Sequence, residues 1–148
     1  MASRSDAARV LVTGCSGFTG RYVAEALAGA GHTVIDAEHA GPNFDLTQPA
    51  TVRAVLDETR PDYVIHLAAL SFVGHSDATA FYAVNVVGTT NLLAALAASK
   101  LQPRRVVIAS SANVYGNTAL SPISEAAPPA PANHYAMSKL AMEYMTTQ

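Results

Sequence analysis

One stretch, Val10–Gly20, constrains the fold of this chain more than any other. It begins with three apolar residues without polar alternation, which is typical of a strand buried on both faces of a parallel sheet. Glycines follow at Gly14, Gly17 and Gly20, and an amphipathic run over 21–28 then predicts a helix. The first glycine permits a tight turn, the second lets the backbone approach a pyrophosphate, and the third lets the helix pack against the strand. A glycine-rich turn in an ordinary α/β protein is the alternative, since such spacings recur by chance.

Short apolar runs and amphipathic stretches alternate along the rest of the chain. Strands are expected at 33–37, 44–46, 63–67 and 105–109. Helices are expected after Thr47 as N-cap, over 78–99 with Asp77 as cap, and over about 133–147. This alternation predicts an α/β fold, a Rossmann-type doubly wound parallel sheet with right-handed crossovers. A ligand of such a sheet binds at the carboxyl ends of the strands, where the strand order reverses.

Composition excludes several classes of protein. The 148 residues carry a net charge of −2 and are 50% hydrophobic, which predicts one domain over 1–148 and no basic footprint for nucleic acid. Cys15 is the single cysteine and the five histidines show no ligand spacing, so neither a disulfide framework nor a metal site is expected. The first nine residues lack a signal-peptide pattern, and no apolar stretch is expected to reach membrane-spanning length. We therefore expect a soluble, cytoplasmic protein with no membrane partner.

An acidic residue follows the second predicted strand at the distance that dinucleotide-binding folds use. Glu38 lies 24 residues after Gly14, where a carboxylate can accept hydrogen bonds from an adenosine ribose. Asp36, on the same face of the strand, is the reserve candidate, and a solvated charge at a strand end is the alternative. No Arg or Lys lies between Asp36 and Arg53 to accept a 2′-phosphate. NAD is therefore the preferred cofactor, with NADP possible.

A second group of polar residues has the types needed for proton transfer. Ser110 and Ser111 end the strand at 105–109, and Tyr135 and Lys139 lie one helical turn apart. A tyrosine titrates near pH 10, and an ammonium one turn away favours its phenolate form and can also hold a ribose hydroxyl. Ser111 would hydrogen-bond the reacting substrate oxygen. Each pattern alone is weak, because any amphipathic helix can contain Tyr-x-x-x-Lys.

The order of the motifs is more specific than any one of them. The chain resembles the extended short-chain dehydrogenase/reductases, the NAD-dependent epimerases, dehydratases and reductases that act on nucleotide sugars. The resemblance covers residues 10–148 and rests on Thr13–Gly20, Asp45–Leu46, His66–Ala69, Asn85–Thr89, Ser110–Gly116 and Tyr135–Lys139.

By this resemblance, each motif has an expected role. Ser111, Tyr135 and Lys139 would be catalytic, and Ser111 is preferred to Ser110 because it stands four residues before Tyr115. Asn85 would stabilise the scaffold of the active site and is grouped with the cofactor-binding residues. The others in that group are Gly14, Ser16, Gly17, Phe18, Thr19 and Gly20 at the pyrophosphate, Glu38 at the ribose, Asp45 and Leu46 at the adenine, Leu67, Ala68 and Ala69 along the cofactor, and Tyr135 and Lys139.

Departures from the family pattern narrow the expected reaction. Ala112 and Asn113 stand where dehydratases carry an acid and a base, so dehydration is not expected. Only six residues separate Glu38 from Asp45, and this short form resembles the GDP-4-dehydro-6-deoxymannose reductase type. The expected reaction is reduction of a 4-keto-6-deoxy sugar nucleotide, with the tyrosine as proton donor and nicotinamide as hydride donor. The alternatives are a nucleotide-sugar 4-epimerase and a non-catalytic NAD-binding fragment.

Length and surface apolarity lead to two more expectations. Family members are about twice as long, so the later strands and the C-terminal substrate domain are expected to be absent from this chain. Its activity by itself therefore stays open. The last predicted strand, 105–109, would have an unpaired apolar edge, and the helices over 78–99 and 133–147 have apolar residues on more than one face. A homodimer is expected through these surfaces.

Overall fold

The structure, a computed structural model, describes residues 7–41 and 43–146. They form two compact units, each discontinuous in sequence. The first unit holds the residues up to Ala68 together with Asn91–Ala109, and the second holds Ala69–Thr90 together with the residues from Ser110 onward. The predicted end of the last helix at 147 lies outside the described residues.

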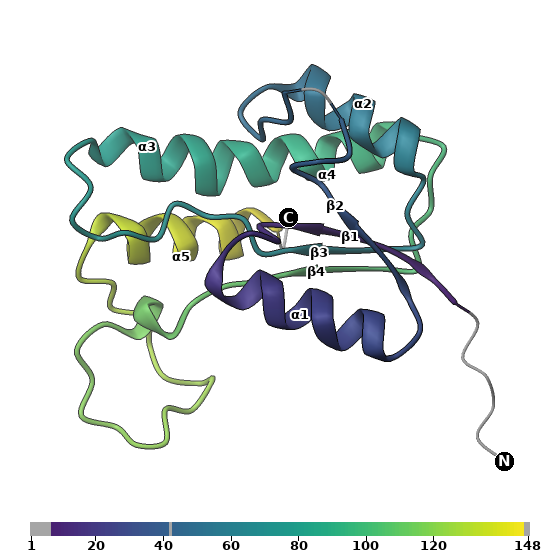
Figure 1. The fold of residues 1–148 in the computed structure, drawn as a ribbon. Helices are drawn as coiled ribbons and strands as arrows, with labels where there is room; N and C mark the ends of the chain where they lie inside the picture. Colours follow the sequence, from purple (N-terminus) through teal and green to yellow (C-terminus); the bar gives the residue numbers. More distant parts are fainter. Residues whose placement is uncertain (1–6, 42, 147–148) are drawn as a thin grey trace, which may run out of the picture. The chain divides into compact units, whose positions relative to one another are not determined.

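The first unit is built on a parallel sheet with strand order β2-β1-β3-β4 (Figure 1). Its strands are β1 (Arg9–Thr13), β2 (Thr33–Asp36), β3 (Tyr63–His66) and β4 (Arg105–Ile108). β1 lies inside the sheet, where Leu11 pairs with Ile35 on one side and with Val64 on the other. The chain therefore adds β2 on one side of β1 and returns to add β3 on the other. This reversal confirms the doubly wound α/β fold.

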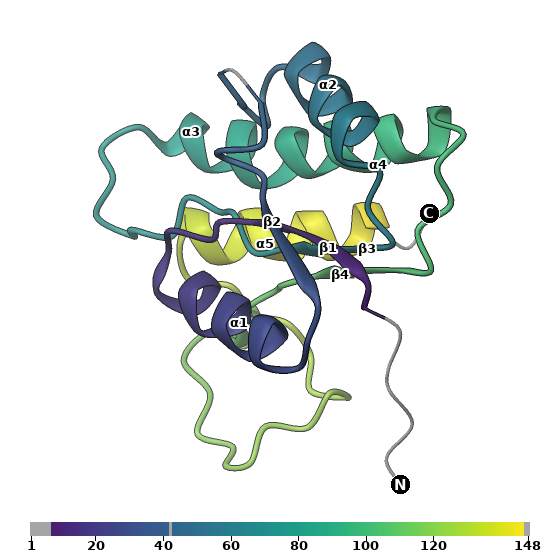
Figure 2. The ribbon, with the colours of Figure 1, turned by 45° about the vertical axis from the view of Figure 1, so that its right-hand side comes forward.

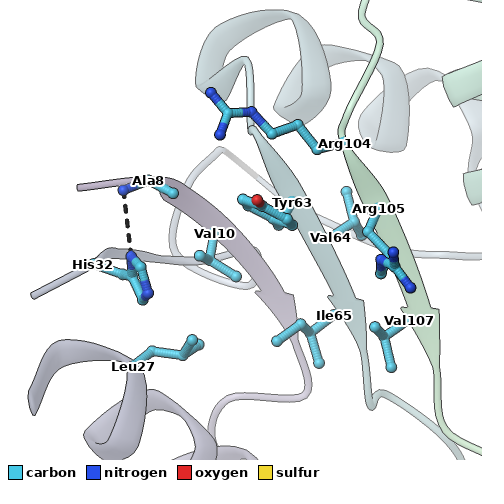
Figure 3. Close-up of a pocket in the computed structure, with 10 residues that line it drawn as sticks. All are labelled: Ala8, Val10, Leu27, His32, Tyr63, Val64, Ile65, Arg104, Arg105 and Val107. Atoms are coloured by element: carbon cyan, nitrogen blue, oxygen red, sulfur yellow. Dashed lines mark hydrogen bonds between the residues drawn. The ribbon is translucent and has the colours of Figure 1, made fainter. Parts of the chain in front are cut away.

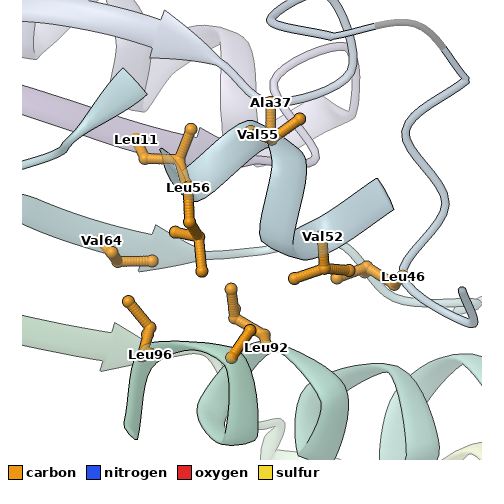
Figure 4. Packing of buried hydrophobic residues seen from close by; sticks show 10 residues of the cluster. Leu11, Ala37, Leu46, Val52, Val55, Leu56, Val64, Leu92 and Leu96 are labelled. Atoms are coloured by element: carbon orange, nitrogen blue, oxygen red, sulfur yellow. The ribbon is translucent and has the colours of Figure 1, made fainter. Parts of the chain in front are cut away.

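Helices cover both faces of this sheet (Figures 1 and 2). Helix α1 (Phe18–Gly29) packs on one face, where Val10 and Val12 of β1 meet its apolar side. On the other face lie α2 (Pro49–Thr59) and the part of α4 (Thr89–Ala98) that belongs to this unit. Side chains alternate between the two faces along a strand. The main core is on the α2 side and comprises Leu11, Ala37, Leu46, Val52, Val55, Leu56, Val64, Leu92, Ala95 and Leu96 (Figure 4).

The segment before α2 differs from expectation. Residues 44–46 form no strand, because side chains bind the backbone there in place of a neighbouring strand. The Asp45 N–H donates to Thr51 Oγ1 at 3.1 Å, and Asp45 Oδ1 accepts from the Thr47 N–H at 2.8 Å. Gln48 is the N-cap of α2, and no described side chain caps the start of this helix. The predicted capping role of Thr47 is therefore wrong. Thr47 instead closes a turn on Asp45.

The α1 face of the sheet is only partly covered. Beside α1 lies a hollow of about 410 Å³, along which Leu27, Ile65 and Val107 are arranged (Figure 3). Val107 on β4 is 48% exposed. The hollow includes the amino-terminal ends of the strands, at Tyr63 and Arg105. Ligands of doubly wound sheets bind at the opposite, carboxyl edge, so this hollow is not the expected ligand site.

The second unit contains short helices around one longer helix. They are α3 (Ala78–Tyr82), the π-helical segment η1 (Ala83–Gly88), the 3-10 turn η2 (Ala112–Tyr115) and α5 (His134–Thr146). Helix α5 packs against α3, η1 and η2. Asp77 caps α3 as expected, since its Oδ1 accepts from the Thr79 N–H at 2.8 Å. The π-helical turn within the predicted 78–99 helix is a feature that the apolar pattern did not indicate.

The helical run Ala78–Ala98 is 21 residues long and apolar enough to cross a membrane by length and composition. The expectation that no apolar stretch reaches this length is therefore wrong. Core helices of globular proteins pass the same test. Here Leu92, Ala95 and Leu96 belong to the main core, and Phe81 is buried in the second unit. The buried positions of this run recur at helical spacing within each unit, at 81, 85 and 89 in the second and at 92 and 96 in the first, as in an amphipathic core helix.

Candidate functional site

The loop between β1 and α1 is so close to its surroundings that only glycine fits at two positions. Gly14 has φ +76°, and a Cβ there would lie 2.7 Å from the backbone nitrogen of Ala68. A Cβ on Gly20 would overlap the Gly14 carbonyl oxygen and lie 2.7 Å from the Cα of Cys15. A Cβ on Gly17 would have one close neighbour, Gly14 O at 3.2 Å. Gly14 and Gly20 thus form the turn, and Gly17 presents open backbone.

The start of α1 suits an anion. Gly17 is its N-cap, and no described side chain caps it. Ser16, Phe18 and Thr19 are exposed, as is Gly17 itself. The first N–H groups of a helix have no partner within the helix and lie at the positive end of its dipole. This cradle of exposed backbone therefore fits the pyrophosphate of a dinucleotide.

Glu38 is the acidic residue that reaches the loop. Its carboxylate accepts from the Gly14 N–H at 2.6 Å and from the Cys15 N–H at 3.3 Å. Asp36 is engaged locally, since its Oδ1 accepts from the Glu38 N–H at 3.0 Å and its Oδ2 lies 2.8 Å from His39 Nδ1. Burial, followed by hydrogen bonding to Asp36, raises the pKa of Glu38 above its ordinary value. The geometry therefore favours Glu38 over Asp36 as the carboxylate at the loop.

Cys15 is a packing residue of the same loop. It is buried, and burial, followed by the charges of Asp36 and Glu38, raises the pKa of its thiol to about 11. Since the thiolate is the reactive form, the neutral thiol is inert near pH 7.

Two side chains that the sequence reasoning did not assign fix the neighbouring wall. Thr13 Oγ1 and His66 Nδ1 share a hydrogen bond of 2.7 Å, and the Ala68 N–H donates to Thr13 Oγ1 at 3.1 Å. The end of β1 is thereby joined to the residues after β3, and Leu67 and Ala68 lie beside Gly14. Thr13 and His66 are the first residues of the motifs Thr13–Gly20 and His66–Ala69, and that membership was the available signal.

Asp45 and Leu46, the residues expected at the adenine, differ in exposure. Asp45 is exposed, and its Oδ1 accepts from the Thr47 N–H and from Thr47 Oγ1, both at 2.8 Å. The Leu46 side chain is buried in the main core, and its carbonyl accepts from Asn91 Nδ2 at 2.8 Å. A ligand could therefore meet Asp45 through its side chain, whereas the side chain of Leu46 is occupied in the core.

In the second unit, Asn85 connects three segments. It is 1% exposed, and its Oδ1 accepts from the Leu70 N–H at 2.8 Å. Its Nδ2 donates to the Leu70 carbonyl at 3.0 Å and to Ser138 Oγ at 2.9 Å. Ser138 Oγ in turn donates to the Tyr135 carbonyl at 2.7 Å. This buried network fits a scaffold role, since both amide donors are used and almost no surface is left for a ligand.

Ser110 and Ser111 have different partners. Ser111 is the N-cap of η2, where its Oγ accepts from the Asn113 N–H at 3.2 Å. Its own O–H proton can therefore still be donated. The Ser110 hydroxyl donates to Glu143 Oε1. Ser111 is thus the better placed of the two to bond a substrate oxygen.

Tyr135 and Lys139 both lie on α5, four residues apart. Tyr135 is half-buried, whereas Lys139 is 3% exposed. Burial lowers the pKa of Lys139, and the charge of Glu143 opposes that shift. The Lys139 Nζ lies 3.8 Å from Met142 Sδ. An ammonium kept out of water next to a tyrosine on the same helix face is the arrangement that promotes loss of a phenolic proton.

The predicted residues divide between the units. The first unit brings the glycine loop, Glu38 and the Leu67–Ala68 wall together. The second unit holds Ala69, Asn85 and the three expected catalytic residues. Within 7–41 and 43–146, no group of three or more His, Cys, Asp or Glu could hold a metal ion.

Comparison with known proteins identifies the family. Residues 10–148 match the NAD dependent epimerase/dehydratase family. The chain belongs to this family. Among curated proteins, it is 37% identical over 140 residues to the GDP-6-deoxy-D-talose 4-dehydrogenase of Aggregatibacter actinomycetemcomitans, covering 95% of this chain and 48% of that protein. It is 39% identical over 144 residues to the GDP-6-deoxy-D-mannose reductase of Pseudomonas aeruginosa, covering 95% of this chain and 46% of that protein.

Solved structures of two enzymes agree with the fold. RMD from Pseudomonas aeruginosa, complexed with NADPH, matches with a TM-score of 0.80 and 37% identity, covering 93% of this chain and 47% of that one. UDP-glucose 4-epimerase from Brucella ovis, in complex with NAD, matches with a TM-score of 0.82 and 34% identity, covering 95% and 47%. The chain spans about half the length of the curated relatives it matches.

Proposed function

We propose that the protein carrying this sequence is an NAD(P)-dependent oxidoreductase that reduces the 4-keto group of a 6-deoxy sugar nucleotide. The observation that carries the proposal is the pair on α5, where half-buried Tyr135 is followed one turn later by buried Lys139. The glycine loop with Glu38 supplies a dinucleotide cradle in the first unit. Two curated relatives are named for oxidation or reduction of a GDP-6-deoxy sugar, which supports this substrate class.

Each side chain of the second unit has a separate task in this proposal. The nicotinamide, when bound, supplies the hydride. The Tyr135 hydroxyl gives its proton to the 4-oxygen of the sugar, and the Lys139 ammonium favours the phenolate that remains. The Ser111 hydroxyl donates a hydrogen bond to the same oxygen, where negative charge develops. Asn85 holds α5 in place through Ser138.

The dinucleotide would be held mostly by backbone. In this assignment the pyrophosphate binds to the exposed turn of Ser16, Gly17, Phe18 and Thr19, which Gly14 and Gly20 shape. Glu38 accepts hydrogen bonds from the ribose hydroxyls, and Asp45 and the backbone of Leu46 border the adenine. The remainder of the dinucleotide is lined by Leu67, Ala68 and Ala69. Tyr135 and Lys139 would also contact the nicotinamide ribose.

The test of the proposal is turnover with two substrates. GDP-4-dehydro-6-deoxymannose is incubated with NADH or NADPH, and cofactor oxidation is followed together with formation of the 4-hydroxy sugar. Stoichiometric cofactor consumption supports the reductase. Redox-neutral isomerisation of a UDP-hexose would instead support a 4-epimerase, a candidate favoured by 34% identity to the UDP-glucose 4-epimerase of Streptomyces lividans. Cofactor binding with neither reaction would point to a non-catalytic NAD-binding protein.

The cofactor preference should depend on Glu38 and on pH. We expect NADH to bind about 10-fold or more tightly than NADPH, because the Glu38 carboxylate repels a 2′-phosphate. Glu38→Gln should narrow the difference in affinity between NADH and NADPH.

The pKa of Glu38 is raised, so its charge is present above that pKa and is lost as pH falls through it. The NADH preference should therefore be largest at high pH and shrink on acidification. Fluorescence titrations measure this preference, and Glu58→Gln, at an exposed position of α2, is the control.

We also propose that the protein is a cytoplasmic homodimer. β4 is an edge strand of the described sheet, and Val107 on it is 48% exposed beside the hollow in Figure 3. Light scattering at high micromolar concentration should show a dimer, and Val107→Glu should weaken it if β4 forms the contact. Val106 packs against the core, so a charged substitution there would disturb folding and would not report on association. A clean monomer of the unsubstituted chain would contradict the proposal.

A further inference from the structure

Ser110 and Glu143 form a hydrogen-bonded pair that has no part in the function proposed above. The Ser110 hydroxyl donates to Glu143 Oε1. Ser110 directly follows the strand residues 105–109, and Glu143 lies on α5 in the same unit. Hydrogen bonds to a charged acceptor are shorter and stronger than neutral ones, so this bond fixes the position of the carboxylate.

Glu143 also lies one helical turn beyond Lys139. Residues four apart on a helix are neighbours on one face, so Tyr135, Lys139 and Glu143 form a single stripe along α5. Lys139 is 3% exposed, and Glu143 is half-buried. A buried ammonium loses its hydration, and it keeps its charge only where an opposite charge or polar groups compensate. Glu143 is the carboxylate whose charge acts on Lys139.

We propose that Glu143, anchored by Ser110, is a positioning residue that keeps Lys139 in its cationic form. The inference rests on the proposed function in one respect, namely that the Lys139 charge serves Tyr135. The Ser110–Glu143 bond holds the carboxylate next to the helix face that carries Lys139. Without that carboxylate, desolvation acts on Lys139 with less opposition, and the ammonium is lost at a lower pH.

The elements that pack against α5 contribute few other titratable groups. η1 contributes none, α3 contributes Tyr82, and η2 contributes Tyr115. Tyr82 hydrogen-bonds to His134 at the start of α5, at 3.0 Å. On α5 itself, His134, Tyr135 and Tyr144 accompany Glu143. Glu143 is therefore the one acidic side chain among the described residues of α3, η1, η2 and α5.

The chain offers a direct test, because Lys100 and Lys139 are its only lysines. The side-chain pKa of each can be followed by NMR on the intact chain with isotope-labelled lysine. In Glu143→Gln, the pKa of Lys139 should fall, because the opposing charge is removed, and that of exposed Lys100 should not change. Ser110→Ala should produce a smaller fall, because the carboxylate remains but loses its anchor. Glu125→Gln, an exposed substitution in the same unit, is the matched control.

An unchanged Lys139 pKa in folded Glu143→Gln would overturn the proposal. If that variant does not fold, Ser110→Ala decides, and an unchanged Lys139 pKa there overturns the proposal equally. The NMR result needs no turnover, so it is independent of the substrate assay. Where the reductase activity is present, the alkaline limb of the pH–rate profile should also move to lower pH in Glu143→Gln, a change that a purely structural role would not produce.

Discussion

Tyr135→Phe should slow hydride transfer about 100-fold or more in the protein that carries this sequence, since general acid catalysis contributes at least that much. The substitution removes one hydroxyl and keeps the ring, so the packing of α5 should survive. The Asn85–Ser138 network should survive too, because it reaches Tyr135 through its backbone carbonyl. Single-turnover measurement with bound reduced cofactor isolates the chemical step.

The matched control is Tyr144→Phe, which removes the same hydroxyl from a 61% exposed tyrosine on the same helix. This variant should react at the unsubstituted rate. If Tyr135→Phe reduces a 4-keto sugar nucleotide at a near-normal rate, Tyr135 is not the proton donor and the mechanism proposed for α5 is wrong. A raised KM with unchanged kcat would assign the hydroxyl to binding alone.

Gly20→Ala should cost about 3 kcal/mol of unfolding free energy or more and abolish dinucleotide binding. The added Cβ would overlap the Gly14 carbonyl oxygen and crowd the Cα of Cys15. Both neighbours are backbone, so no side chain can rotate away and the loop itself must move. Denaturant unfolding measures the stability, and fluorescence titration with NADH measures the binding.

Gly29→Ala is the control at the other end of the same helix, where no atom lies within 4 Å of the added Cβ. It should leave the stability unchanged or raise it by up to about 1 kcal/mol. A substitution at Gly17 separates the effect on stability from the effect on dinucleotide binding, since a Cβ there would have one close neighbour. Replacing it with a larger residue should weaken cofactor binding with little loss of stability. Equal stabilities for Gly20→Ala and Gly29→Ala would refute the steric argument.

The parallel sheet was predictable because its strands are nearly uninterrupted apolar runs. Leu11 and Val64 fall in strands where the sequence has no competing pattern, and the glycines mark where β1 ends. The strand predicted at 44–46 is wrong because two apolar residues flank Asp45, as they would in a strand. Periodicity cannot show that Thr51 binds the backbone of Asp45 and that Thr47 binds its side chain. The π-helical turn at Ala83–Gly88 is equally invisible to an apolar stripe.

Candidate site residues were predictable by type and order but not by contact. Nothing in the sequence indicates that the Glu38 carboxylate binds the Gly14 N–H, because 23 residues and a helix separate them. The Ser110–Glu143 bond joins positions 33 residues apart in the chain. Local spacing reveals pairs on one helix, such as Tyr135 and Lys139. Tertiary hydrogen bonds between distant segments need the folded chain.

The discontinuity of the first unit has a consequence for synthesis on the ribosome. β3 pairs with β4 through partners such as His66 and Ile108, and 42 residues of translation separate them. At about 5–20 residues per second, this interval lasts about 2–8 s. Throughout it, Val64 lacks β4 as a neighbour, and for most of it Leu92 and Leu96 of the core are also absent. The nascent chain therefore exposes an apolar strand edge while the inserted segment 69–90 is made, and this is the period in which a chaperone has most to protect.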